Sequence, residues 1–118
     1  MILADTSVWV DHLRSGNVQF SDYLNAGHIV CHPYIIGELA CGNIKNRNEI
    51  LSMLSSLPTI QLAEHDEVMY LISEHNLHGR GIGWIDAHLL SSALMAKCKI
   101  WTFDRPLEKV AENLKISI

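Results

Sequence analysis

Cysteine is scarce in this chain, and its three copies have no paired spacing. Cys31, Cys41 and Cys98 are an odd number spread over 118 residues, a pattern that favours reduced thiols over a disulfide framework and indicates a cytoplasmic location. No apolar run approaches the ~20 residues that a membrane-spanning helix needs. The first residues lack the basic region and cleavage site of a secretory signal. We therefore expect a cytoplasmic protein with no membrane partner.

Positive charge is also scarce. Nine Lys and Arg residues face 13 Asp and Glu, for a net charge of −4, whereas a general nucleic-acid-binding domain is usually basic. Four of the acidic residues are, however, candidates for a metal site, and two divalent cations would neutralise them, which weakens this exclusion. The hydrophobic content of 48% is enough for a core. Without linkers or repeats, residues 1–118 form one domain of common size.

Short apolar segments alternate with helical patterns along the chain. We expect strands at residues 2–4, 28–32, 59–63, 99–103 and 114–118. We expect helices at residues 6–14 (capped by Thr6 or Ser7), 20–26, 33–41, 47–56, 66–76 and 85–96, and a last short one from residue 106. This alternation predicts an α/β fold, a three-layer α/β/α arrangement with a central parallel sheet of about five strands.

Four acidic residues stand at separate places in the chain, and each lies in a local sequence suited to presenting it. They are Asp5, Glu38, Asp86 and Asp104. Asp5 and Asp104 follow predicted strands, and active sites of open parallel sheets lie beyond the carboxyl ends of the strands. Oxygen ligands without a cluster of Cys or His favour Mg²⁺ or Mn²⁺ over zinc. The four carboxylates are therefore expected to form a divalent-metal site.

Each member of this set also has a simpler interpretation. Asp86 falls in the first turn of a helix, where the helix dipole alone favours a carboxylate. Glu38 lies inside an apolar helix, either on a narrow polar stripe or in a functional role. Ser7 and Thr102 each stand two residues from a strand-end aspartate, and their hydroxyls could orient a carboxylate or a water.

The chemistry that such a set favours is phosphodiester hydrolysis. Two metals ~4 Å apart stabilise the attacking and leaving oxygens of an in-line displacement and activate water, so no Ser, Cys or His nucleophile is required. The expected products carry a 5′-phosphate and a 3′-hydroxyl. Arg80 and Arg105 could hold a phosphate nearby, or be ordinary surface arginines. Trp84 could stack on a base, or serve only in packing. Because four like charges repel one another without metal, Asp5→Ala is expected to keep or raise the melting temperature.

Taken together, these motifs resemble the PIN-domain family and, within it, the VapC-type toxin ribonucleases. The resemblance covers the whole chain and rests on Asp5-Thr6-Ser7, Glu38 in Gly-Glu-Leu, Asp86 in Trp-Ile-Asp-Ala-His, and Trp101-Thr102-Phe103-Asp104. It implies a divalent-metal-dependent endoribonuclease whose acidic quartet falls on Asp5, Glu38, Asp86 and Asp104, with Asp5 and Asp86 as the direct metal ligands and Thr102 at the hydroxyl position. It also implies an antitoxin partner, homodimerisation, and a structured RNA substrate such as tRNA or rRNA.

Two other functions remain open on the sequence. The first is a phosphatase of the aspartyl-phosphate type with Asp5 as nucleophile, although such enzymes usually place a second aspartate where Ser7 stands. The second is a non-catalytic PIN-like binding module, which would be expected to lack one of the four acidic residues. A phospho-acceptor regulator would need paired acidic residues after the first strand, and these are absent.

Overall fold

The protein is built around a short parallel sheet. The computed structural model describes residues 1–118. Strand β1 (Ile2–Ala4) lies in the middle, between β2 (Ile29–Val30) and β3 (Lys99–Trp101), and both of its neighbours run parallel to it. All three residues of β1 are buried, as expected for a strand that is covered on both faces. The carboxyl ends of β1 and β3, with Asp5 and Thr102 just beyond them, therefore lie side by side.

The sheet is smaller than predicted. In place of about five strands there are three, extended at each edge by one isolated parallel bridge, between Cys31 and Thr59 and between Ile100 and Ser117. The expected strands at residues 59–63 and 114–118 are thus reduced to one bridge each. At the second edge the cause is local, because Lys115 has a positive φ of 62°, which interrupts the extended backbone that a longer strand needs.

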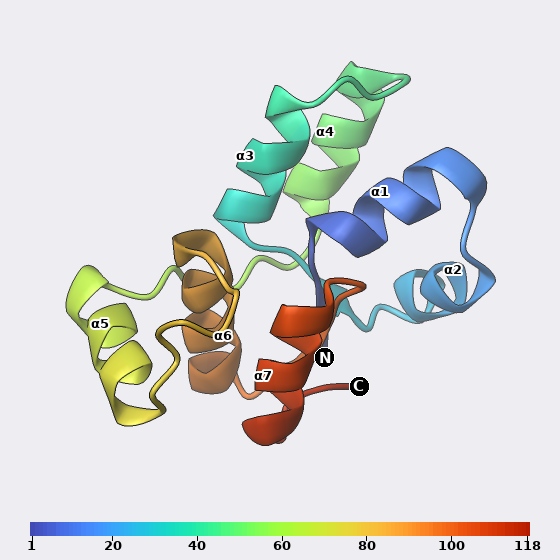
Figure 1. Cartoon of the computed structure of the whole chain (residues 1–118). Helices are drawn as coiled ribbons and strands as arrows, with labels where there is room; N and C mark the ends of the chain where they lie inside the picture. Colours follow the sequence, from blue (N-terminus) through green and yellow to red (C-terminus); the bar gives the residue numbers. More distant parts are fainter.

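Seven helices surround the sheet (Figure 1), and all seven were expected. They are α1 (Thr6–Ser15), α2 (Val18–Asn25), α3 (Pro33–Cys41), α4 (Arg47–Ser56), α5 (His65–Glu74), α6 (Trp84–Ala96) and α7 (Arg105–Asn113). In Figure 1, α1 and α2 lie on one side of the central strands, α5 and α6 lie on the other, and α3 and α4 project together from one end. The α/β fold class is confirmed. No helix combines the length and the apolar character needed to cross a membrane.

A core of 24 buried residues fixes the sheet to its helices. Trp9 of α1 and Phe20 of α2 pack edge to face with ring centroids 4.6 Å apart, and Trp101 of β3 lies 5.9 Å from Phe20. Such aromatic pairs add stability beyond the area that they bury. The core therefore holds the start of α1 against the ends of β1 and β3.

His32 joins α3 to α6. Its Nδ1 accepts a hydrogen bond from the Tyr34 backbone N–H at 3.0 Å and so caps α3. Nε2 must then carry the ring proton, and it donates to Ser92 Oγ at 3.1 Å. Ser92 Oγ also accepts from the Ala63 N–H at 3.2 Å. Burial, together with the nearby His88, lowers the pKa of His32 to about 4. The neutral imidazole thus fixes the helices that carry Glu38 and Asp86.

Candidate active site

Asp5 is held by hydrogen bonds on both carboxylate oxygens. Its side chain is only 7% exposed. Oδ1 accepts from Ser7 Oγ at 2.5 Å and from the Val8 N–H at 3.2 Å, and Oδ2 accepts from Thr102 Oγ1. Asp5 is therefore the N-cap of α1, so the expected caps, Thr6 or Ser7, were wrong. Asp5 directly precedes Thr6, and its carboxylate accepts from the free N–H of the first turn in place of the hydroxyls.

Two hydroxyls connect the ends of β1 and β3. Thr102 Oγ1 donates to Asp5 and accepts from the Asp104 N–H at 3.0 Å. Ser7 Oγ donates to Asp5 and accepts from the Phe103 N–H at 3.0 Å. Because each hydroxyl has one proton to donate, both protons are directed at the same carboxylate. This arrangement fixes the orientation of the Asp5 carboxylate.

Asp86 and Asp104 each occupy the N-terminus of a helix. Asp86 Oδ2 accepts from the Gly83 N–H at 3.1 Å at the start of α6. Asp104 is the N-cap of α7, where its Oδ2 accepts from the Leu107 N–H at 3.0 Å. Helix N-termini stabilise carboxylates in any protein. Both aspartates therefore also stabilise the helices at whose ends they lie. In both residues the second oxygen remains available for a ligand.

Glu38 lies on α3 and faces α1. Its Oε1 accepts a hydrogen bond from Thr6 Oγ1 at 2.8 Å, between residues 32 positions apart. Sequence reasoning considered Thr6 only as a helix cap and missed this contact. The one available signal was its place directly after Asp5, at the carboxyl edge of the sheet. Through Thr6, the start of α1 positions Glu38 as well as Asp5.

The four carboxylates share one electrostatic environment. Burial raises the pKa of Asp86 most, the hydrogen bond from Gly83 opposes this, and the charges of Asp104, Asp5 and Glu38 raise the pKa further. No three His, Cys, Asp or Glu side chains lie close enough to coordinate one ion directly. The carboxylates are thus close enough to influence the pKa of Asp86 but too far apart for three of them to bind one ion directly. Both can hold, because charges act over longer distances than the ~2.0–2.6 Å of metal–oxygen bonds. An all-oxygen, mutually repelling set fits a hard divalent cation that keeps several waters, as Mg²⁺ does.

Two arginines line one cavity beside this acidic group. A cavity of about 550 Å³ separates the loop before α6 from α7. It is lined by Arg80, Arg105, Pro106, Glu108, Lys109 and Glu112. The loop approaches α7 closely, because a Cβ added to Gly81 would lie 3.2 Å from Pro106 Cβ. This close approach places Arg80 on the same cavity as Arg105, which directly follows Asp104.

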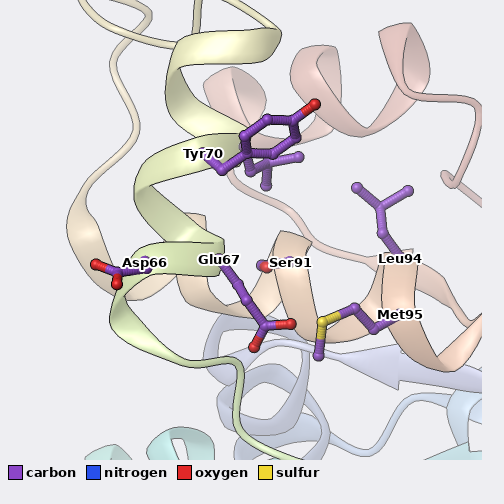
Figure 2. A pocket seen from close by; sticks show the side chains of 7 residues that line it. Asp66, Glu67, Tyr70, Ser91, Leu94 and Met95 are labelled. Carbon is purple, nitrogen blue, oxygen red and sulfur yellow. The ribbon is translucent and has the colours of Figure 1, made fainter.

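A second cavity lies away from the acidic edge. It has a volume of about 440 Å³ and opens between α5 and α6 (Figure 2). It is lined by Asp66, Glu67, Tyr70, Leu71, Ser91, Leu94 and Met95, which include none of the four predicted acidic residues. Glu67 is already engaged, since its Oε1 accepts from the Glu64 N–H at 2.8 Å in the capping box of α5. The candidate active site is therefore the carboxyl edge of the sheet.

Comparison with known proteins identifies the family of this chain. The chain belongs to the PIN domain family, whose model matches residues 2–113. It is 43% identical over 119 residues to Ribonuclease VapC32 from two strains of Mycobacterium tuberculosis, an alignment that covers 100% of this chain and 96% of the relative. The crystal structure of PAE2754 from Pyrobaculum aerophilum shares the fold, with a TM-score of 0.67 at 19% identity over 99% of this chain and 87% of that chain.

Proposed function

We propose that this protein is a divalent-metal-dependent endoribonuclease, the toxin of a VapBC-type toxin–antitoxin pair. The observation that carries the proposal is the set of four acidic residues at one sheet edge, where the charges of three of them act on Asp86. Identity of 43% to a ribonuclease over the whole chain supports the same activity. The odd, unpaired cysteines are consistent with action in the cytoplasm.

In this proposal Asp5, Glu38, Asp86 and Asp104 hold Mg²⁺ or Mn²⁺, with Asp5 and Asp86 as direct ligands. The bound metal would supply neutralising charge and activate water for in-line attack on phosphorus. Ser7 and Thr102 hold Asp5 in one orientation. A carboxylate that is already oriented loses little conformational freedom on binding a cation, which favours a precise site.

In the same proposal, the two arginines bind the phosphate backbone of the substrate. Arg80 and Arg105 line one cavity next to Asp104, and guanidinium groups bind phosphate through paired, charge-assisted hydrogen bonds. They would hold a phosphate next to the cleaved one, while the acidic group holds the reacting centre. This division allows an acidic protein, with a net charge of −4, to bind RNA through a local basic surface. Structured RNA such as tRNA or rRNA is the proposed substrate.

We propose that the antitoxin binds in the groove between α1, α3 and α4. This groove has a volume of about 570 Å³ and adjoins Thr6 and Glu38. Its apolar lining is Val10, Leu13, Leu39, Ile44 and Ile50, with Arg14 and Lys45 also lining it. An amphipathic segment with acidic residues would match this lining and cover the active edge. Homodimerisation remains part of the proposal through the family resemblance.

Cleavage of a labelled RNA tests the proposed activity. Wild-type protein should cut it with Mg²⁺ or Mn²⁺ and should be inactive with EDTA, and Asp86→Asn should lose activity in both metals. The products should carry 5′-phosphate and 3′-hydroxyl ends. A 2′,3′-cyclic phosphate would contradict metal-activated water as the nucleophile.

A phosphomonoester assayed in parallel separates the phosphatase alternative. That alternative requires Asp5 as a nucleophile and usually a second aspartate two residues later, and that position is Ser7, which donates a hydrogen bond to Asp5. We therefore expect no turnover of the phosphomonoester. Hydrolysis of the phosphomonoester without cleavage of RNA would favour the phosphatase. Absence of both activities would favour a binding module.

A further inference from the structure

Trp84 differs from the other two tryptophans in its exposure. Trp9 is fully buried and Trp101 is 6% exposed, whereas Trp84 at the start of α6 is 40% exposed. An indole of this size usually contributes to a core or to an interface. The proposed catalytic residues do not use it.

The indole of Trp84 is nevertheless held in place by other rings. His88 contacts it edge to face, with centroids 4.8 Å apart and an interplanar angle of 85°, and His65 lies 5.2 Å from it at 46°. Tyr34 packs in turn on His88 at 4.9 Å. These four rings form an aromatic row that joins α3, α6 and α5. The ring of Trp84 is thus supported by neighbours while two fifths of the residue remains open to solvent.

The position of Trp84 relates it to the acidic group. Trp84 and Asp86 share the first turn of α6 and are displaced by only ~3 Å along the helix axis, at ~1.5 Å per residue. Side chains two positions apart on a helix point to different sides, so Trp84 lies at the same end of α6 as Asp86 but leaves the helix on another side. Arg80 and Arg105 lie against α7, near Asp104. A strand whose phosphate reaches the carboxylates would therefore have to pass the N-terminal end of α6 for its neighbouring base to reach the exposed indole of Trp84.

We propose that Trp84, supported by His65 and His88, is a stacking platform for an unpaired RNA base next to the cleaved phosphodiester. Stacking on an aromatic ring tolerates any base, because every base has a π-face. In a duplex the bases are already stacked on one another, so the platform favours single-stranded or looped RNA. This substrate preference rests on the proposed function, whereas the binding step can be measured without cleavage.

Fluorescence titration in EDTA tests the platform, because the strand stays intact and Trp84 is the solvent-exposed indole. Three ligands of equal length are compared: a single-stranded RNA, the same strand with abasic positions, and a duplex. The single strand should quench the exposed indole, and the abasic strand and the duplex should not. The two variants lack the reporting indole, so their affinities are measured by filter binding. Trp84→Ala should bind the single strand roughly tenfold or more weakly than wild type, and Trp84→Phe should retain most of the affinity.

The matched variants separate stacking from a packing role. Circular dichroism of Trp84→Ala and Trp84→Phe checks the fold, and Trp84→Phe keeps an aromatic ring if the alanine variant unfolds. Equal quenching by the abasic strand, or full affinity in a folded Trp84→Ala, would overturn the platform. If the platform is overturned while Asp86→Asn still abolishes metal-dependent cleavage, the nuclease proposal stands. If base-dependent quenching occurs but no metal supports cleavage, the platform stands and the nuclease proposal fails.

Discussion

At the scale of single residues, Asp5 shows how a proposed metal ligand also holds the fold together. Its carboxylate caps α1 and accepts from two hydroxyls, one of them 97 positions away in the chain. Repulsion within an acidic group, the argument available from the sequence, considers only the charge that Asp5 adds. The hydrogen bonds predict the opposite effect on stability. Removing the carboxylate leaves three donors without their acceptor, which should destabilise the protein.

Asp5→Ala should therefore lower the stability of the metal-free protein. Loss of a helix cap costs about 0.5–2 kcal/mol, and the unsatisfied hydroxyls of half-buried Ser7 and buried Thr102 add to this. We expect a total of roughly 2 kcal/mol or more, measured by urea denaturation in EDTA. Asp5→Asn keeps an acceptor oxygen and a good cap residue, so it should lose less. An unchanged or higher melting temperature for Asp5→Ala would restore the repulsion argument.

His32 should make stability depend on pH. Its pKa is about 4 in the folded protein, below the ordinary 6.5, so between these values the unfolded chain binds more protons. Stability is therefore full above pH 6.5 and is lost as the pH falls towards 4, by up to about 3 kcal/mol at 1.36 kcal/mol per pKa unit. Urea midpoints from pH 7 to pH 4 measure this loss. His32→Asn, which keeps a cap acceptor, should show a shallower dependence, and equal slopes would contradict the assignment.

At the scale of elements, the parts of the fold that could be predicted are those with local signals. Pro33 and Gly42 mark the two ends of α3, and the 47–56 helix was found at its expected bounds. The strands were overestimated, because pairing at a sheet edge depends on distant partners and on the positive φ of Lys115.

The candidate site likewise has one part that the sequence could predict and one part that it could not. Its four acidic residues could be selected from the sequence because two of them follow strands and two lie on helices with recognisable starts. The partners of these residues could not be selected. The bond from Thr6 to Glu38 spans 32 positions and the bond from Thr102 to Asp5 spans 97, and no spacing rule within a helix or strand reports such distances.

The loop before α6 offers a matched pair of glycines for testing the arginine cavity. Gly81 and Gly79 both have positive φ, of 81° and 70°, but only at Gly81 would a Cβ meet Pro106, at 3.2 Å. Alanine should destabilise the protein at either position because of the backbone conformation. Only Gly81→Ala should also push Arg80 away from Arg105 and weaken RNA binding. Filter-binding affinities measure this effect, and equal losses in Gly79→Ala and Gly81→Ala would argue against the cavity.

At the scale of the whole molecule, divalent cations should stabilise the fold. A ligand that binds only the folded state adds about 2.7 kcal/mol at a concentration of 100 times its Kd, and relief of repulsion at the acidic edge is the physical source here. Mn²⁺ or Mg²⁺ should therefore raise the melting temperature of the wild-type protein, and EDTA should reverse the increase. Asp86→Asn, which keeps an acceptor for the Gly83 N–H, should respond much less. An equal response in both proteins would place the cation elsewhere.

The central position of β1 has a consequence for synthesis of the protein. β1 is translated well before its neighbour β3 and before the threonine that contacts Asp5, which lies 97 positions later in the sequence. Closing so long a loop is possible only once those residues have left the ribosome. A nascent chain therefore carries its first aspartate without the groups that orient it. An enzyme proposed to cut the RNA of its own cell would thus gain its complete site only after β3 and Thr102 have been synthesised.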